Sequence, residues 1–289
     1  MDKREWLKAN FMGIIRKIYK RSFFKIIIDF FMFIYIFYKR RIMPDKWFIK
    51  KEYKRIFGEY PNLDLPSTLN EKIQWLKLYD RSSLHTKCAD KYESRNYINQ
   101  KIGKDYLVPL LYHTRDVNEI TADRMPDYPV AVKTNHDSGV VEIIRDKNNY
   151  DFSKLREILK KSLNKNYYYI SRERQYKDII PRVIIEKLLV CEDGKLPNDY
   201  KIHCFNGEPK IIYVSIDREG INKRNIYSSS WEPLMFTWAS KYKSLNNIRG
   251  KEIPRPKNYE KMLDIAKILA ADFKYVRIDL FNLNGTIKC

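Results

Sequence analysis

The spacing of apolar and polar positions changes along the chain, from helical in the first part to strand-like in the second. Residues 45–60 and 90–101 have helical spacing, and Thr68 and Glu71 form a capping box ahead of another apolar run. Further on, the pattern predicts helices at 152–164 and 258–271, and strands at 129–134, 140–144, 182–189, 200–205, 210–216 and 275–281.

Two turns join these strands into hairpins. Asn206-Gly207 separates the strands at 200–205 and 210–216 and is typical of a tight hairpin. Residues 282–285 form a turn after the last long strand, and residues 286–289 have the pattern of a return strand. Hairpins with flanking helices predict an α+β fold of antiparallel sheets.

An apolar segment near the N-terminus stands apart from this pattern. Between Arg21 and Lys39 lie 17 residues, of which eleven are Phe or Ile. This length is at the lower limit for a transmembrane helix, and Asp29 makes full insertion costly. Lys25 and Asp29 lie on one side of a helix, which favours a helix that lies on or dips into a membrane. The alternatives are a spanning helix and a helix packed on the catalytic body.

The positive charge of the chain is concentrated in the same region. Residues 1–56 contain 16 Lys or Arg and 5 Asp or Glu, a net charge of +11 out of +20 for the whole chain. An anionic membrane surface attracts such a segment, and a solvated basic surface is the alternative. We expect no nucleic-acid partner, because the aromatic residues are not interleaved with the basic ones in an RNA-binding pattern.

The cysteines predict neither disulfides nor a zinc site. Cys88, Cys191, Cys204 and Cys289 include no C-x-x-C pair and no zinc-ligand spacing. Scattered thiols are typical of a reducing compartment. Together with the basic N-terminus they predict a cytoplasmic protein at the inner face of the plasma membrane.

The common nucleotide and nucleophile motifs are absent from the sequence. It has no P-loop, no G-x-G-x-x-G fingerprint and no G-x-S-x-G elbow. It also has no D-x-D triplet, which disfavours a metal-dependent glycosyltransferase. The candidate chemistry therefore lies on the predicted strands.

The first two candidates are Lys133 and Glu186. Lys133 projects from an apolar strand just before the turn at residues 136–139, and burying a lysine is costly unless it meets an anion such as phosphate. Glu186 ends an apolar strand, where its carboxylate could accept hydrogen bonds from a ribose or an exocyclic amine. The alternatives are an exposed edge-strand lysine and a strand end in solvent.

Two later strands each carry a polar face. Asp199, Lys201 and His203 alternate along one strand, and Arg277 and Asp279 alternate along another. Arg277 and Asp279 form either a structural ion pair or a site where a carboxylate meets Mg²⁺ beside an anionic substrate.

In this order, six stretches resemble the TupA-like branch of the ATP-grasp superfamily, which is named for teichuronopeptide biosynthesis. The resemblance covers about residues 60–289. The stretches are residues 69–80, 87–92 with Arg95, 132–139, 181–186, 199–207 and 276–280.

The resemblance implies an ATP-grasp-like fold that uses ATP and Mg²⁺. Residues 1–56 are then an N-terminal helical extension, 57–127 a helical part of the catalytic region, and 128–289 the nucleotide-binding region. Arg277 and Lys201 are the implied catalytic residues, and Asp279 is the implied Mg²⁺ ligand. The implied cofactor-binding residues are Lys133, His136, Ser138, Gly139, Glu186, Asp199 and Lys201.

The resemblance also implies a reaction class. Enzymes of this superfamily activate a carboxylate as an acyl-phosphate, which an amine or similar nucleophile attacks. We expect a ligase that acts on a polysaccharide or lipid-linked sugar acceptor in capsule, O-antigen or teichuronic-type synthesis. The alternatives are a glycosyltransferase of the same pathways, a non-catalytic membrane-bound subunit and a catalytically impaired copy.

In one respect the sequence departs from the family pattern. The family continues after its final strand into a return strand, whose glutamate is a further metal ligand. The present sequence ends at Cys289, where that strand should be forming. We therefore expect a nucleotide-binding region that is truncated at its C-terminus, with the ladder of residues 276–280 unpaired on one side.

Overall fold

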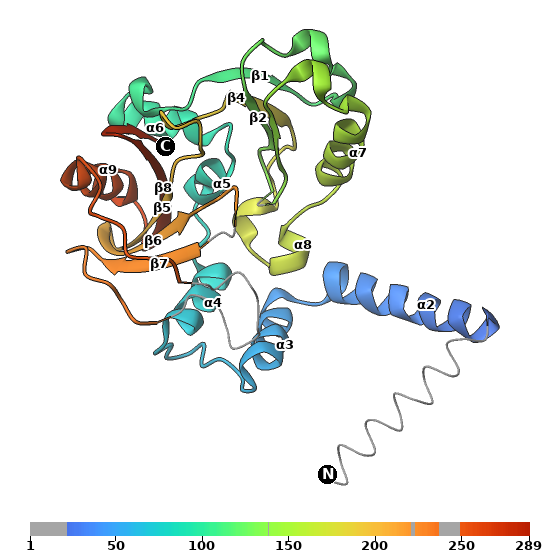
Figure 1. Cartoon of the computed structure of the whole chain (residues 1–289). Coiled ribbons are helices and arrows are strands. Elements are labelled where there is room, and N and C mark those ends of the chain that lie inside the picture. Colours follow the sequence, from blue (N-terminus) through green and yellow to red (C-terminus); the bar gives the residue numbers. More distant parts are fainter. Residues whose placement is uncertain (1–21, 138, 221–222, 237–248) are drawn as a thin grey trace. The chain divides into compact units, whose positions relative to one another are not determined.

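The computed structural model describes residues 22–137, 139–220, 223–236 and 249–289 (Figure 1). It divides the chain into two compact units. The first comprises Met1–Ser83 and Asn166–Lys177, and the second comprises Leu84–Lys165 and Asp178–Cys289. The region 57–127, which was expected to be helical, is thus divided between the two units after Ser83. Residues 166–177 lie in the predicted nucleotide-binding region 128–289 but belong to the first unit.

The first unit is helical in its described part. A small core holds its central helices together, formed by Met43, Phe48, Ile49, Leu63 and Leu78. The elements are α2 (Ser22–Phe37), a π-helical turn η1 (Tyr38–Ile42), α3 (Asp45–Phe57), α4 (Leu69–Tyr79), the short α8 (Tyr168–Ser171) and the 3₁₀ turn η6 (Arg174–Tyr176).

The helix ends of the first unit follow from particular residues. Helix α3 ends at Phe57, three residues before the predicted end, because Gly58 takes the left-handed conformation (φ 87°) that terminates it. The predicted capping box of α4 is confirmed, with the Thr68 hydroxyl accepting from the Glu71 amide at 3.2 Å. Hydrogen bonds from the Asn62 and Thr68 amides lower the pKa of Glu71 to about 2.

A buried arginine fixes the C-terminal end of the α2–η1 segment. The Arg172 guanidinium donates to the carbonyl oxygens of Arg40 at 2.8 Å, Lys39 at 3.1 Å and Met43 at 3.1 Å. It also lies 3.2 Å from the Asp45 carboxylate. Lys39 and Arg40 lie in the last turn of η1, where backbone carbonyls lack partners within the helix. Arg172 therefore both caps the segment and ties it to the unit.

Membrane crossing receives no support from the described residues. None of the helices among them combines the length and apolar character that a span needs.

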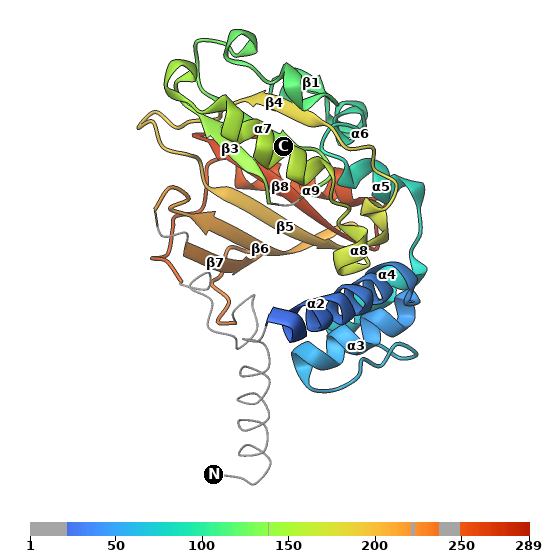
Figure 2. The ribbon, with the colours of Figure 1, turned by 90° about the vertical axis from the view of Figure 1, so that its right-hand side faces the viewer.

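The second unit contains two antiparallel sheets (Figure 2). The four-stranded sheet has the order β1-β4-β2-β3, and the five-stranded sheet has the order β7-β6-β5-β8-β9. The strands are β1 (Leu110–Thr114), β2 (Val130–Thr134), β3 (Val141–Ile144), β4 (Val183–Lys187), β5 (Asp199–Phe205), β6 (Glu208–Ile216), β7 (Lys223–Ser228), β8 (Tyr275–Leu283) and β9 (Thr286–Lys288).

Helices and short turns complete this unit. The helices are α5 (Ser83–Ala89), α6 (Ser94–Ile102), α7 (Phe152–Leu163) and α9 (Tyr259–Ala270). The 3₁₀ turns are η2 (Lys104–Tyr106), η3 (Val117–Glu119), η4 (Ala122–Arg124) and η5 (Lys147–Asn149). Helices with antiparallel hairpins confirm the predicted α+β class.

Each sheet packs one face against a helix. In the four-stranded sheet Val130, Val132, Val183 and Ile185 pack with Leu155 and other residues of α7. In the five-stranded sheet the apolar face packs on the side of α9 that carries the predicted stripe, Met262, Ile265, Ala266 and Leu269. Strand alternation places the polar candidates on the other face of each sheet, which on the four-stranded sheet also carries the buried Ile184.

Three parts of the second unit differ from the sequence prediction. The single helix predicted at 90–101 is wrong at its start, because the chain forms α5 and α6 with a turn at Asp90, whose carboxylate accepts the Tyr92 amide at 2.8 Å. Strand β1 lies within the region that was expected to be helical. Strand β7 was not predicted at all.

The return strand is short in the structure. Strand β9 pairs with Phe281–Leu283 of β8, while β5 pairs with β8 from Tyr275 to Phe281. Among the described residues, Tyr275–Leu280 therefore has a strand partner on one side only, as predicted for residues 276–280.

Candidate functional site

The polar face of the four-stranded sheet carries a buried ion pair. Lys133 on β2 and Glu186 on β4 project from the side opposite α7, and Lys133 Nζ lies 2.6 Å from Glu186 Oε2. Their side chains are 22% and 7% exposed. Arg95 Nη1 of α6 lies 3.4 Å from the other carboxylate oxygen. The predicted lysine therefore meets an anion, which is the carboxylate of the other candidate on this sheet.

The turn that follows β2 is fixed from both sides by hydrogen bonds. The Asn135 side chain is fully buried, donates to Asp90 Oδ1 at 2.9 Å and accepts the Arg182 amide at 2.8 Å. Lys91 Nζ donates to the carbonyl oxygens of Thr134 at 3.0 Å, Asn135 and Asp137. These bonds hold the backbone of residues 134–137 in place.

Lys91 adds positive charge to this region. Burial, and next the positive charge of Lys133, lower the pKa of Lys91 to about 8. Lys91, Lys133 and Arg95 are three cationic side chains in this region, and the negative charges of Asp137, Asp90 and Glu186 act on Lys91 in return.

The three candidates in the turn differ in position. His136 is buried, and its Nε2 lies 3.2 Å from the Ser162 carbonyl and 3.1 Å from the Lys165 carbonyl at the end of α7. Burial lowers its pKa. Gly139 is exposed. Ser138 lies outside the described residues.

The polar face of the five-stranded sheet brings together the other candidates. The antiparallel register places Lys201 opposite Asp279 and His203 opposite Arg277 on neighbouring strands β5 and β8. Strand β5 also carries Asp199. The predicted alternation of these residues on one face is confirmed by the register and by the apolar core on the other face.

Two ion pairs form on this second face. Arg277 contacts Asp279 through two parallel bonds, Nε to Oδ1 at 2.6 Å and Nη2 to Oδ2 at 2.7 Å. Lys201 pairs with Asp199 Oδ2. The second oxygen of Asp199 is buried and has no hydrogen-bond partner among the described residues. A buried unpaired carboxylate oxygen is costly, so this atom is a ready acceptor for a ligand donor.

His203 is a neutral member of this face. It is buried, and its Nδ1 lies 2.9 Å from the Tyr275 hydroxyl. Burial, followed by the positive charge of Arg277 and Lys201, lowers the pKa of His203 to about 4. It is therefore uncharged at neutral pH and serves as a hydrogen-bonding group rather than as a cation.

The structure thus gathers the candidates into two groups. Lys133 and Glu186 form one group, and Asp199, Lys201, Arg277 and Asp279 form the other. No hydrogen bond or ion pair joins the two groups within the part of the chain that the structure describes.

Several residues around the first group received no role from the sequence. Asp90, Lys91 and Arg95 lie in a stretch that the family resemblance included, and Asn135 lies in another. Their involvement could have been inferred from membership of those stretches. Their individual contacts could not, because they join positions more than 40 residues apart.

Each of the two groups carries side chains that could contact a phosphate and side chains that could contact a metal ion. Their cations can donate to phosphate oxygens. No cluster of three or more His, Cys, Asp or Glu side chains that could hold a metal occurs among the described residues. Mg²⁺ in nucleotide sites takes one or two carboxylates together with phosphate and water, and the partly exposed carboxylate of Asp279 can supply one ligand.

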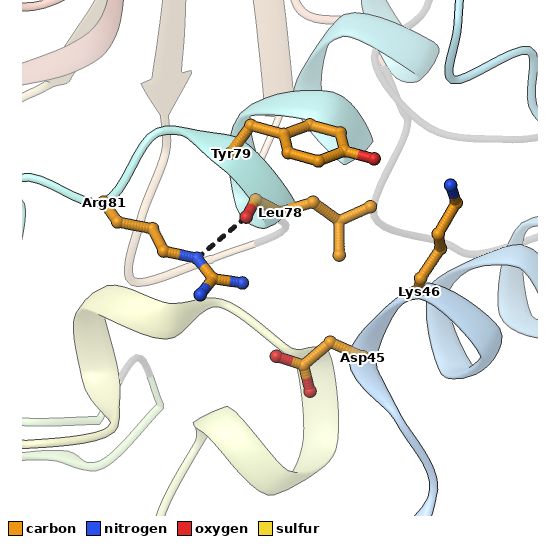
Figure 3. A pocket seen from close by; sticks show the side chains of 5 residues that line it. All are labelled: Asp45, Lys46, Leu78, Tyr79 and Arg81. Carbon is orange, nitrogen blue, oxygen red and sulfur yellow. Dashed lines mark hydrogen bonds between the residues drawn. The ribbon is translucent and has the colours of Figure 1, made fainter.

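A pocket of about 500 Å³ lies in the first unit (Figure 3). Arg81 Nε donates to the Leu78 carbonyl at 2.8 Å, and the Asp45 carboxylate accepts from the Tyr168 hydroxyl at 2.8 Å. The pocket contains none of the predicted site residues. Its lining consists of Asp45, Lys46, Leu78, Tyr79 and Arg81.

A family model described as TupA-like ATPgrasp matches residues 71–288. The chain belongs to the TupA-like ATP-grasp family. The match begins within α4 and includes both polar sheet faces, whereas α2 and α3 precede it. No protein with a curated description matches the chain.

Similar solved structures include ATP-grasp ligases. D-alanine–D-alanine ligase from Bacillus anthracis, complexed with ATP, is 15% identical with a TM-score of 0.36, over 70% of this chain and 51% of that chain. The ATP-grasp ligase PsnB with its minimal precursor is 11% identical with a TM-score of 0.36, over 71% and 51%. A RiPP-associated ATP-grasp ligase from Chryseobacterium gregarium, with ADP and a leader and core peptide, is 12% identical with a TM-score of 0.33, over 76% and 57%. The chain spans about half the length of these structures.

Proposed function

We propose that this member of the TupA-like ATP-grasp family is an ATP-dependent ligase that joins a carboxylate to an amine. The family match over residues 71–288 carries the proposal. The lysine and arginine side chains on the two sheet faces support it, because a ligase of this kind handles the phosphates of ATP and the charge that develops during phosphoryl transfer.

In this proposal the four-stranded sheet holds the nucleotide. Lys133 binds a phosphate group of ATP, and the backbone of the following turn assists it. Glu186 orients the Lys133 ammonium through their contact at 2.6 Å and accepts from the adenosine side of the nucleotide. Lys91 keeps the turn in place through its bonds to the Thr134 and Asn135 carbonyls.

The five-stranded sheet supplies the groups nearest the reaction. Lys201 is a second phosphate contact, and the free oxygen of Asp199 accepts a hydrogen bond from the ligand. Arg277 stabilises the negative charge of the transferred phosphoryl group. Asp279 is a ligand of Mg²⁺, which supplies charge neutralisation when bound. Arg277 holds both oxygens of Asp279, so this role requires that Arg277 turn toward the substrate.

The substrates belong to cell-surface polysaccharide synthesis in our proposal, and the name of the family is what suggests this setting. A uronic acid of a capsule, O-antigen or teichuronic-type chain is a carboxylate of the required kind, and an amino acid is a suitable amine. Attack of the amine on the activated carboxylate forms an amide and releases phosphate, while ATP leaves as ADP.

The test is ADP formation by the full chain with Mg²⁺, ATP, a uronic-acid oligosaccharide and a panel of amino acids. We expect ADP release that requires both the carboxylate and the amine, and that is lost in Arg277→Ala. Lys210→Ala, which removes an exposed strand lysine away from both groups, is the matched control and should retain activity. Consumption of a nucleotide sugar without ADP release from ATP would instead identify a glycosyltransferase.

A further inference from the structure

The described N-terminal helix exposes apolar side chains on every side. Helix α2 has 16 residues and is about 24 Å long. Ile26, Phe31 and Met32 point in different directions around the helix and are 69%, 64% and 50% exposed. Large apolar side chains gathered in this way mark a binding surface. The exposed members are Ile26, Ile27, Phe30, Phe31, Met32, Phe33, Ile34, Tyr35, Ile36 and Phe37.

A basic and aromatic segment follows this helix directly. Residues 39–55 contain eight Lys or Arg and two Asp or Glu. Arg40 and Arg41 are exposed, and Trp47 on α3 is 65% exposed. Tryptophan and basic residues are enriched where a protein meets the headgroups of a membrane. Residues 39–55 therefore have the composition of a segment at a membrane interface, and we call this segment the collar.

The collar continues directly from α2 through η1, and contacts within the first unit hold it in place. The Arg172 guanidinium binds the carbonyls of Lys39, Arg40 and Met43, as described above, and the Lys39 ammonium pairs with Glu52 of α3 at 2.6 Å. The apolar helix and the basic collar therefore belong to one unit. Whatever binds the apolar surface of α2 also meets the collar.

We propose that α2 inserts into the headgroup and acyl-chain boundary of an anionic membrane, with residues 39–55 at the headgroup level. This surface precedes the region that the family match covers, so it is separate from the ligase chemistry. A lipid surface satisfies both features at once: acyl chains cover Phe and Ile side chains, and anionic headgroups neutralise Arg40 and Arg41.

A second copy of the chain fits these features less well. Two collars brought together would repel each other, because both are basic. Segment 22–38 contains no Gly or Ala, the small residues that allow helices to approach closely in membrane-type packing. The composition therefore favours lipid over self-association.

The experiment measures co-sedimentation of the full chain with phosphatidylcholine vesicles that contain or lack phosphatidylglycerol. We expect binding to the anionic vesicles, weakened by salt. The double variant Phe30→Asp/Phe33→Asp should lower the partition coefficient about a hundredfold, because it places two charges in the apolar surface. Leu65→Asp/Ile268→Asp, at exposed apolar positions elsewhere, is the matched control and should bind as the natural protein does.

A second pair of variants tests the collar. Arg40→Glu/Arg41→Glu should reduce binding at least tenfold, given about 1 kcal/mol per basic residue at an anionic surface. Lys195→Glu/Lys257→Glu, a charge reversal at exposed positions of the second unit, is its control. Equal binding of all variants, or no binding of the natural protein to either vesicle, would overturn the proposal. So would a dimer in sedimentation equilibrium that Phe30→Asp/Phe33→Asp dissociates.

Discussion

Two ion pairs of similar length occupy different environments on the two sheets. Lys133 and Glu186 approach to 2.6 Å on the four-stranded sheet, where the carboxylate is 7% exposed and Arg95 adds a second cation. Arg277 and Asp279 also approach to 2.6 Å on the five-stranded sheet, but their side chains are 48% and 41% exposed.

This difference in exposure predicts different roles for the two ion pairs. Removing one partner of a buried pair leaves a charge without solvent or counterion and is strongly destabilising. An exposed pair contributes little to stability and is free to exchange its partner for a ligand. We therefore expect the first pair to be important to the fold as well as to the ligand, and the second chiefly to the ligand.

The largest expected effect is that of Glu186→Ala. It leaves Lys133 and Arg95 facing each other without a carboxylate, so the free energy of unfolding should fall by about 3 kcal/mol. Urea denaturation measures this change. Glu157→Ala, at an exposed position of α7, should change stability by less than about 0.5 kcal/mol. Similar losses of unfolding free energy in the two variants would show that the buried Glu186 matters no more to stability than an exposed glutamate.

Lys133→Ala should cost less than Glu186→Ala. Arg95 remains 3.4 Å from Glu186 and partly compensates the carboxylate, so we expect a loss of about 2 kcal/mol. Lys210→Ala, at an exposed strand position, is the control. A double-mutant cycle with Glu186→Ala should show strong coupling, and additive effects would mean that the contact at 2.6 Å contributes nothing.

The pH dependence of the unfolding free energy should reflect the titration of His203 on the five-stranded sheet. The pKa of His203 is lowered from 6.5 to about 4 in the folded protein. As pH falls below 6.5 the unfolded chain takes up the proton first, so the folded state loses stability between pH 6.5 and pH 4. At pH 5.5 the loss should be about 1 kcal/mol relative to pH 7.5.

His203→Gln removes the titrating group and provides the comparison. The difference in unfolding free energy between the natural protein and this variant should change with pH over that window only. A difference that is constant from pH 7.5 to pH 5 would contradict a buried neutral histidine.

Arg277→Ala should have the smallest effect on stability. An exposed ion pair contributes less than about 1 kcal/mol and is weakened by salt, so denaturation curves in high salt should nearly coincide with those of the natural protein. A loss of unfolding free energy as large as that of Glu186→Ala would contradict the expected difference between the buried and the exposed ion pair.

The sequence anticipated the alternating faces but not all of their contacts. Period-two spacing was enough to place Asp199, Lys201 and His203 together, and Arg277 beside Asp279, because strand geometry alone decides which side chains share a face. The pairing of Lys133 with Glu186 was not foreseen, because it depends on the order β4-β2 within the sheet, which local spacing does not contain.

The missed elements have similar causes. The turn at Asp90 replaces the start of the segment 90–101, which has helical spacing. It forms because the Asp90 carboxylate accepts from the Tyr92 amide and from the buried Asn135 side chain. Strands β1 and β7 lie at the edges of their sheets. Strand β1 has one fully buried residue, and the buried residues of β7, Asn225, Ile226 and Tyr227, are consecutive and do not alternate. In each case tertiary contacts override local preference.

ATP binding by the full chain tests the central claim most directly. Calorimetric titration with ATP and Mg²⁺ should show saturable binding by the natural protein and by Lys210→Ala, and at least tenfold weaker binding by Arg277→Ala, whose fold we expect to be intact. A UDP-sugar should not compete. Undiminished affinity in Arg277→Ala, or preferential binding of the UDP-sugar, would contradict the assignment of these two sheet faces to an ATP-dependent ligase.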